Sequence, residues 1–396
     1  MGWSIKSNFR MTKDSIRMKY QIFSLIFLAL LVGVIGCSDS GNTNEINIGF
    51  IGPLSERATD LGVGPSKAMQ LAIDRYNQSR EKGEPKINLF IEDDQWEKER
   101  ALPAYDKLRH DHKIDVLFVS NTGGTVAVQD NVLKDGVILI NPLNNDKMLA
   151  SMNKNTFEIA KSTEEANGVV GVRIIELGLK KVVIYHFPND FMTRAAFSIK
   201  ELLDERGIEN TVEVVDKDQV DFTESLARFK EIGVEGYVFC GYKNFGFAMK
   251  QARDMGIEAP FFGSTTLLDP EFFDNSEGTI VNTECTFFTP ADGNYVLAHQ
   301  FLEDYELKYG EKPFSIWPPM QAYDAMNIVL DKLRHVNEKK PQQVKLEDWL
   351  RAELHSVRYY QGVCGNLSIT EDGSSRGIYF SLYNVAGRGE LVKVKR

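Results

Sequence analysis

The chain has 396 residues, of which 43% are hydrophobic and 26% are charged, and this composition excludes intrinsic disorder. Its 46 Lys and Arg residues against 56 Asp and Glu give a net charge of −10, which argues against a nucleic-acid partner, because such a partner requires a basic face. The length predicts two domains, and the four cysteines are too few for a disulfide scaffold.

Residues 1–36 have the organisation of an export signal. An apolar stretch of 14 residues, 22–35, is shorter than the roughly 20 that a membrane-spanning helix needs. The five basic residues before it are Lys6, Arg10, Lys13, Arg17 and Lys19. We expect this segment to be removed, and Met18 is an alternative start that leaves a compact signal. Subtracting these five basic residues and Asp14 from the totals leaves a net charge of −14.

The apolar stretch is followed by Gly36, Cys37 and a polar segment up to Asn44. This arrangement resembles the bacterial lipobox, in which a Cys after small residues receives a diacylglyceryl group and becomes the new N-terminus. The resemblance implies lipidation of Cys37, a tether at 37–44, and a protein anchored to the cell-envelope membrane on its periplasmic or extracytoplasmic face. The alternative is an ordinary signal, or a short buried helix, with a chance Cys.

From residue 45, apolar strand-like runs alternate with amphipathic stretches, a pattern typical of parallel α/β architecture. A first set has strands at 46–51, 87–91, 116–119 and 137–140, with helices at 65–78, 98–110 and 126–134. A second set follows a helix at 168–177. It has strands at 182–185, 211–215, 236–240 and 261–262, with helices at 193–206, 222–231 and 245–255.

The C-terminal part adds helices at 298–308 and 321–334. Residues 365–370 and 377–384 then alternate like two antiparallel strands joined by a turn at 371–373. Two open α/β sheets place loops at their carboxyl edges, so a cleft between two such lobes is the expected ligand site.

The ordered set of segments resembles the type I periplasmic solute-binding proteins, in particular the leucine/isoleucine/valine-binding branch that serves ABC importers. The segments include INIGFIGPLSERATDLGVGPSKAMQLAIDRYN, IDVLFVSNTGG and GVILINP in the first set, and KKVVIYHFPNDF and AMKQARDMGIEAPFFGSTTLLDPEF in the second. The resemblance covers about 45–396 and rests on the order of the segments rather than on one motif.

The resemblance implies two Rossmann-like lobes with parallel sheets, joined by three crossovers. Lobe 1 is expected at 45–161 plus 286–360, and lobe 2 at 162–285 plus 361–396. The implied mechanism is hinge closure around a small solute, with the closed form recognised by an ABC permease.

We assign site residues by the resemblance only where segments of this sequence align with those of the family. Leu54 and Ser55 lie in the first loop, and Thr122 stands about where a family Ser grips a ligand carboxylate. The backbone amides of Gly123 and Gly124, at a helix start, are candidate anion-binding donors. The remaining positions are Leu143, Asn145, Phe191, Tyr242 and Thr265. Thr265 is the main departure, because amino-acid binders present an acidic residue in this loop to the ligand's ammonium group. Asp190, Asp269 and Glu284 are candidate replacements, and an amino acid, an amide, a urea-like solute and an aromatic acid all stay open.

Other chemistries find little support in the sequence. Glu92, Asp93 and Asp94 end a strand as a metal site might, but the family has acidic residues here as loop structure, so we expect no metal. No cofactor is expected, because the glycines at 62–64 lack the spacing of a phosphate-binding loop. No GxSxG or HExxH motif supports catalysis. Cys240, Cys285 and Cys364 are expected to be buried free thiols.

Three functions therefore remain. The first is a lipoprotein receptor that delivers a small polar solute, such as an amino acid, an amide or a related organic acid, to an ABC permease. The second is a ligand-sensing module of the same fold that signals to a membrane partner. The third is an exported enzyme, which would need an acid/base pair in the cleft that the sequence does not reveal.

Overall fold

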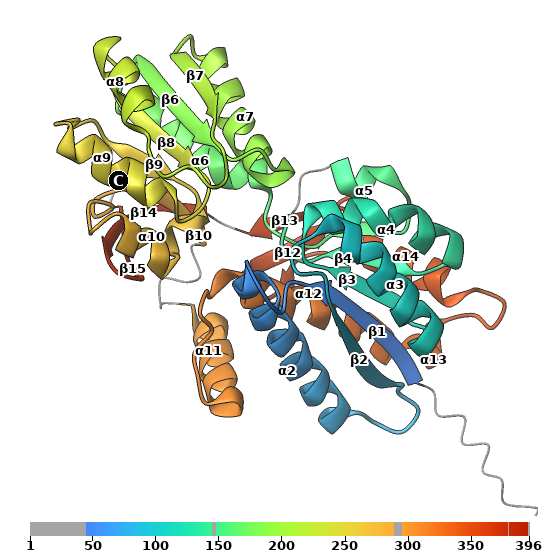
Figure 1. The fold of residues 1–396 in the computed structure, drawn as a ribbon. Helices are drawn as coiled ribbons and strands as arrows, with labels where there is room; N and C mark the ends of the chain where they lie inside the picture. The colour runs from blue at the N-terminus through green and yellow to red at the C-terminus, as the bar shows by residue number, and fades with distance from the viewer. Residues whose placement is uncertain (1–44, 145–147, 289–294, 379, 395–396) are drawn as a thin grey trace, which may run out of the picture. The chain divides into compact units, whose positions relative to one another are not determined.

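The computed structural model describes residues 45–144, 148–288, 295–378 and 380–394 (Figure 1). The side chains of Met148, Asp190, Thr265, Leu268 and Phe288 are not described. The predicted signal, the tether with Cys37, and Asn145 lie outside the described residues.

The first sheet is entirely parallel, with the strand order β2-β1-β3-β4-β5. Ile48 and Phe50 of β1 belong to the core that contains the inner face of α2, whereas Ile51 packs with α3 and α4 on the opposite face. Both faces of β1, β3 and β4 are largely buried, which explains why these strands read as continuous apolar runs. The strands are β1 (Glu45–Gly52), β2 (Lys86–Asp93), β3 (Val116–Val119), β4 (Ile138–Asn141) and β5 (Thr156–Glu158).

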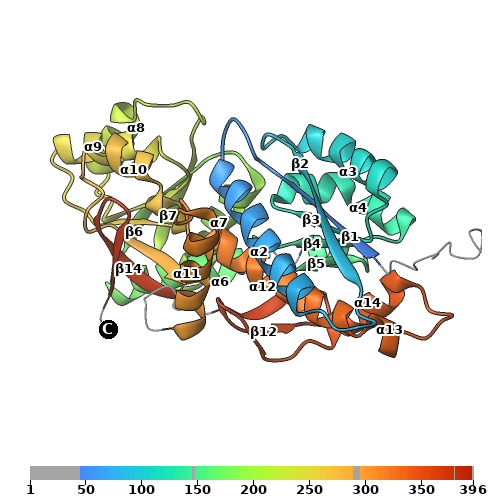
Figure 2. The ribbon, with the colours of Figure 1, turned by 90° about the horizontal axis from the view of Figure 1, so that it is seen from below.

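Helices from two distant parts of the chain cover this sheet. The C-terminal α12 lies beside α2, as Figures 1 and 2 both show. The helices grouped with the first sheet are η1 (Thr59–Leu61), α2 (Val63–Ser79), α3 (Lys98–His112), α4 (Thr122–Asp135), α5 (Met148–Met152), α11 (Val296–Tyr309), α12 (Trp317–Arg334), α13 (Val336–Lys339) and α14 (Leu346–His355).

The second sheet has the order β15-β14-β10-β9-β8-β6-β7, in which β14 and β15 run antiparallel to their neighbours. Helices α6 and α7 cover one face and α8, α9 and α10 the other (Figure 1). The strands are β6 (Lys181–His186), β7 (Glu209–Val214), β8 (Gly236–Cys240), β9 (Phe261–Gly263), β10 (Glu284–Phe288), β14 (Phe380–Gly387) and β15 (Glu390–Lys393). The helices are α6 (Thr163–Glu176), α7 (Asp190–Glu205), α8 (Thr223–Glu231), α9 (Phe245–Asp254), η2 (Thr265–Leu268) and α10 (Pro270–Asn275).

A third, small antiparallel sheet corrects the expected C-terminal hairpin. It contains β11 (Tyr360–Gln361), β12 (Gly365–Ile369) and β13 (Ser375–Ile378). β12 pairs with β13, but the second predicted strand is divided, because β14 leaves for the second sheet and pairs with β10. Gly377 in β13 has a φ of 102°, a conformation that favours glycine, so the backbone deviates from regular strand geometry before it changes sheets.

The expected fold class is confirmed: the protein has two lobes, each built on a Rossmann-like parallel sheet. The chain passes between the two sheets three times, between β5 and α6, between β10 and α11, and between β13 and β14. The lobe boundaries predicted above stay a prediction. Cys240, Cys285 and Cys364 are buried free thiols, as expected.

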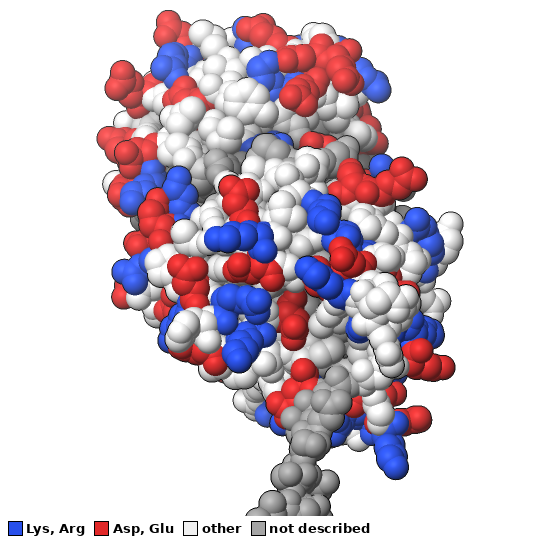
Figure 3. All heavy atoms as spheres, turned by 90° about the vertical axis from the view of Figure 1, so that its right-hand side faces the viewer, with Lys and Arg blue, Asp and Glu red and all other residues white. Residues whose placement is uncertain are grey.

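Within the described ranges, none of the helices combines the length and the apolar character required to cross a membrane. Figure 3 shows one face of the molecule, on which Lys and Arg side chains are interspersed with Asp and Glu side chains.

Candidate ligand-binding site

Asp93, at the carboxyl end of β2, holds the first loop in place. Its carboxylate accepts hydrogen bonds from the amide of Leu54 at 2.8 Å and from Oγ of Ser55 at 2.6 Å. Burial alone would raise the pKa of Asp93, but these hydrogen bonds and one from the amide of Gln95 lower it. Leu54 and Ser55 are therefore fixed at the edge of the first sheet, while Arg57 is exposed.

The ends of β3 and β4 are joined by a buried amide network. Asn121 caps α4 by accepting a hydrogen bond from the amide of Gly124 at 2.5 Å, and its Nδ2 donates to Asp94 at 2.6 Å. Thr122 is the first residue of α4, which begins four residues before the predicted start, and its Oγ1 accepts from Nδ2 of Asn144 at 3.3 Å. The structure thus brings Thr122 and Gly123 to the same sheet edge as Leu54 and Ser55.

Gln321 of α12 connects this edge to the segment that leads into the second lobe. Its Nε2 donates to the carbonyl of Leu143 at 3.5 Å, and its Oε1 accepts from the amide of Lys161 at 2.5 Å. The amide of Leu143 is itself held by Oδ1 of Asn141 at 3.0 Å. Sequence reasoning missed Gln321, which is 1% exposed and lies in the fully buried first half of α12.

In the second lobe, Phe191 and Tyr242 follow the carboxyl ends of β6 and β8. The Tyr242 ring packs on Phe187 with centroids 5.7 Å apart, and Asn189 shares a hydrogen bond with Tyr242 while also capping α7. Burial and the negative charge of Asp60 raise the pKa of Tyr242. Thr265 is the first residue of η2, and its side chain is not described.

Two carboxylates from different lobes interact electrostatically near Tyr242. Asp60 lies in η1, and Asp269 caps α10 by accepting from the amide of Glu271 at 2.9 Å. Burial and the charge of Asp269 raise the pKa of Asp60 to about 6, and burial raises the pKa of Asp269. Glu284, another candidate for binding an ammonium group, is instead engaged by Arg173 in two hydrogen bonds of 2.7 and 3.0 Å.

Lys161 is a buried cation at the start of α6 that sequence reasoning also missed. Its Nζ lies 3.8 Å from the centroid of the Trp317 ring and 5.4 Å from that of Phe191. Burial lowers the pKa of Lys161 to about 7. An enclosed recess adjoins it, lined by Lys161, Thr163, Ala166, Asn167, Phe191, Ser264 and Thr286.

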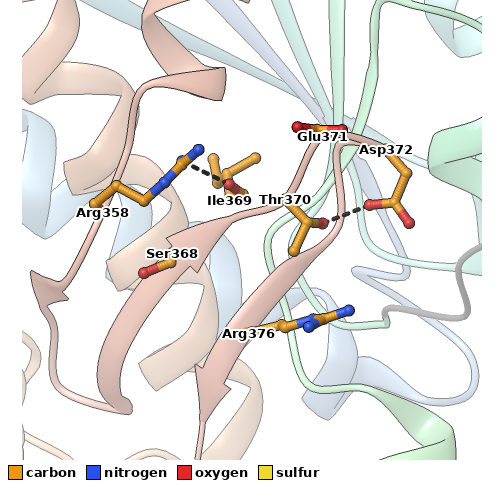
Figure 4. Close-up of a pocket in the computed structure, with 7 residues that line it drawn as sticks. All are labelled: Arg358, Ser368, Ile369, Thr370, Glu371, Asp372 and Arg376. Carbon is orange, nitrogen blue, oxygen red and sulfur yellow. Dashed lines mark hydrogen bonds between the residues drawn. The ribbon is translucent and has the colours of Figure 1, made fainter.

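A larger hollow lies elsewhere, on the surface beside β12 and β13 (Figure 4). It has a volume of about 540 Å³ and contains none of the residues predicted from the sequence. Two hydrogen bonds join its lining residues: Arg358 donates to the carbonyl of Ile369 at 2.8 Å, and Thr370 donates to Asp372. It is open to solvent, so a ligand bound there would keep most of its contact with water.

No cluster of three His, Cys, Asp or Glu side chains suited to a metal ion occurs among the residues that the structure describes. Asp93 and Asp94 instead accept hydrogen bonds from loop residues.

Comparisons with known proteins agree with this geometry. A family model described as "Periplasmic binding protein" matches residues 45–379. A leucine-binding protein from Thermotoga maritima has 17% sequence identity and a TM-score of 0.77, over 88% of this chain and 98% of that one. LivJ from Streptococcus pneumoniae, a branched-chain amino acid transporter substrate-binding protein solved with isoleucine, has 23% identity and a TM-score of 0.73, over 88% and 100%.

A solute-binding protein of an ABC transporter from R. palustris, solved with benzoate, has 18% identity and a TM-score of 0.74, over 88% of this chain and 95% of that one. None of the curated proteins matches the chain in sequence.

Two parallel-sheet lobes with loop residues gathered at their carboxyl edges define a solute-binding protein of the type I periplasmic fold. The chain belongs to the periplasmic binding protein family.

Proposed function

We propose that this protein is the substrate-binding lipoprotein of an ABC importer and captures a small polar solute by closing its two lobes. The observation that carries the proposal is the convergence of side chains from both lobes. Asp60 of η1 interacts electrostatically with Asp269 and Tyr242, and Trp317 of α12 contacts Lys161, which leads into α6. A solute held between such loops loses its water while polar groups on both sides replace that water's hydrogen bonds.

The proposed ligand-contacting set is the one expected from the sequence: Leu54, Ser55, Thr122, Gly123, Leu143, Asn145, Phe191, Tyr242 and Thr265. The solutes recorded for solved relatives, isoleucine, benzoate and 3,4-dihydroxybenzoic acid, support a small organic acid or amino acid for this chain as well. Export, anchoring through Cys37 and delivery to an ABC permease complete the proposal.

A melting-temperature screen with amino acids, amides and aromatic acids tests the function. A solute that binds only the folded protein at about 100 times its Kd adds roughly 2.7 kcal/mol to the free energy of unfolding, so its melting temperature must rise. Small-angle scattering with the same solute should show a smaller radius of gyration, since the lobes close. A solute that raises the melting temperature without compaction would contradict hinge closure, and a screen without a single rise would contradict solute binding.

A further inference from the structure

Asp324 is a buried acid in the middle of α12, and its carboxylate holds one turn of the chain. The residue is 1% exposed. Its Oδ1 accepts a hydrogen bond from the amide of Val363 at 2.7 Å, and its Oδ2 accepts one from the amide of Cys364 at 2.8 Å. The Cys364 thiol donates to the same carboxylate. Burying a carboxylate costs free energy even when it is hydrogen-bonded, so an acid at this place needs an explanation.

An aspartate serves both amides of the turn at once, which its amide counterpart cannot do. An asparagine has one acceptor oxygen, and its side-chain nitrogen would face the second amide as another donor. The turn also lies directly against α12, because a Cβ atom added to Gly362 would collide with the carboxylate of Asp324. The carboxylate and the glycine therefore fix the turn at 362–364 to the helix.

This turn contacts the chain where the second passage between the lobes ends and where the third begins. The hydroxyl of Tyr295, the residue before α11, donates to the carbonyl of Gly362 at 2.8 Å. Gly365, which follows Cys364, pairs with Ile378, the last residue of β13. A movement of the turn would therefore displace both passages.

The same face of α12 holds the first passage. Gln321 lies three residues before Asp324, so the two side chains leave the helix on one side. Its Oε1 accepts from the amide of Lys161, between β5 and α6, at 2.5 Å. Gln321 and Asp324 thus connect one helix of the first lobe to all three passages.

We propose that Asp324 is a positioning residue of the hinge: it fixes the turn at 362–364 to α12, so that the three passages bend about one helix when the lobes close. This inference rests on the proposed function, because it concerns how closure is guided. Without this anchor the second and third passages would move independently of α12. Closure would then have to order them, and solute binding would weaken.

Hydrogen–deuterium exchange of the full chain without a solute tests the anchor. Asp324→Asn removes one of two acceptors, so the amides of Val363 and Cys364 should exchange about 10-fold faster or more. Residues 375–378 and the beginning of α11 should also exchange faster, while β1 and β6 keep their wild-type rates. Asp331→Asn is the matched control, because Asp331 lies in the same helix and is exposed. It should change none of these rates.

The dependence of exchange on pH is a readout that an uncharged structural contact would not give. Burial raises the pKa of Asp324 to about 7, although its hydrogen bonds lower it. Burial also raises the pKa values of the facing groups Cys364, Tyr295 and Tyr360, so these stay neutral near pH 7.

In the released turn the solvated carboxylate would have a pKa of about 4, so the anchored state binds more protons and loosens as the pH rises. After correction for the intrinsic rate, exchange at 362–364 in the wild type should become about tenfold faster from pH 6 to pH 8. Asp324→Asn should lack this dependence.

Calorimetric titration connects the anchor to solute binding. The probes are isoleucine, benzoate and 3,4-dihydroxybenzoate, the solutes recorded for solved relatives. A probe that binds the wild type should bind Asp324→Asn about 5- to 10-fold more weakly, although Asp324 lies outside the proposed ligand-contacting set. The affinity of Asp331→Asn should equal that of the wild type.

The outcomes separate this inference from the proposed function. Unchanged exchange at 362–364 in Asp324→Asn, faster exchange confined to these residues, or unchanged affinity for a bound probe overturns the anchor and leaves solute binding intact. If Asp324→Asn does not fold, the wild type decides, since exchange at 362–364 that does not depend on pH overturns the inference. If none of the probes binds, the exchange measurements decide alone. The proposed function then fails only if the wider screen also gives no rise in melting temperature.

Discussion

Asp93 and Asp94 are neighbours in the chain whose pKa values shift in opposite directions. Asp93 is surrounded by donors from the first loop, and these hydrogen bonds outweigh its burial and lower its pKa. Asp94 is fully buried, and burial raises its pKa in spite of hydrogen bonds from the amide of Trp96 and from Asn121. Each carboxylate fixes a different loop at the same sheet edge, so the pair organises the first half of the proposed site.

Replacing Asp93 by Ala should destabilise the protein and impair solute binding together. The change leaves the amide of Leu54 and the hydroxyl of Ser55 without their acceptor, a loss of about 1–3 kcal/mol in the free energy of unfolding. Denaturant unfolding measures this loss. Glu92→Ala is the matched control, because Glu92 pairs with the exposed Lys107 and its loss should cost less than about 1 kcal/mol. Equal losses for the two variants would contradict the role given to Asp93.

Asp60 should make the stability of the protein depend on pH. Its pKa is raised from 3.8 to about 6 in the folded protein, so the folded state binds more protons than the unfolded state in that window. Its effect on stability is therefore neutral below about pH 4, becomes steadily more unfavourable between about pH 4 and pH 6, and stays unfavourable above pH 6. Asp60→Asn should match the wild type near pH 4 and exceed it by about 1–3 kcal/mol near pH 7. Denaturant unfolding at both pH values checks this, and a difference independent of pH would refute it.

Lys161 shows why part of the site was not predicted from the sequence. A lysine just before a helix is usually exposed, and nothing in its local pattern marks it as buried. Its burial depends on Trp317, which is brought to it only by the folding of a distant helix. The loop residues Leu54, Ser55, Thr122 and Leu143 were predictable as neighbours, by contrast, because the carboxyl ends of parallel strands share one edge.

At the scale of elements, most strands and helices were predicted, but β5 and α14 were not. The strand Val116–Val119 was predicted to the residue, and α2 was predicted within two residues at its start. β5 was missed because it has three residues, too few for a periodic pattern, and its last residue, Glu158, is a buried acid. α14 was also missed.

Gly377 is the residue on which the division between β13 and β14 depends. A Cβ atom added there would lie 1.7 Å from the carbonyl oxygen of Asn366 in β12, so Gly377→Ala requires the backbone to move. We expect a loss of about 4 kcal/mol or more. Gly389→Ala is the control: its φ is 73° but nothing lies within 4 Å of the new Cβ, so it should cost only about 1–2 kcal/mol. Similar melting temperatures for the two variants would show that the close approach to Asn366 is not needed.

At the scale of the whole molecule, the two lobes and the three passages of the chain between them determine where a solute can bind. The carboxyl-edge loops of both sheets carry the proposed contacts, and Gln321 and Trp317 of α12 link the first lobe to the segment around Lys161. A movement of one lobe relative to the other would therefore change the distances between residues of the proposed site. Such coupling allows solute binding to be reported by the conformation of the whole protein.

The proposed lipid anchor on Cys37 would decide where this conformation is read. Two or three acyl chains hold a protein on a membrane far more firmly than one, and the polar segment at 38–44 belongs to the proposed tether. Cys37→Ala removes the sulfur that would carry the diacylglyceryl group, so we expect the variant to leave the membrane fraction and to keep the wild-type melting temperature. Membrane fractionation measures whether the protein is attached to the membrane, and metabolic labelling with a fatty acid measures whether it is acylated. Cys285→Ser is a control that retains Cys37. Retention of the Cys37→Ala protein on membranes would mean that something other than a lipid on Cys37 holds it there.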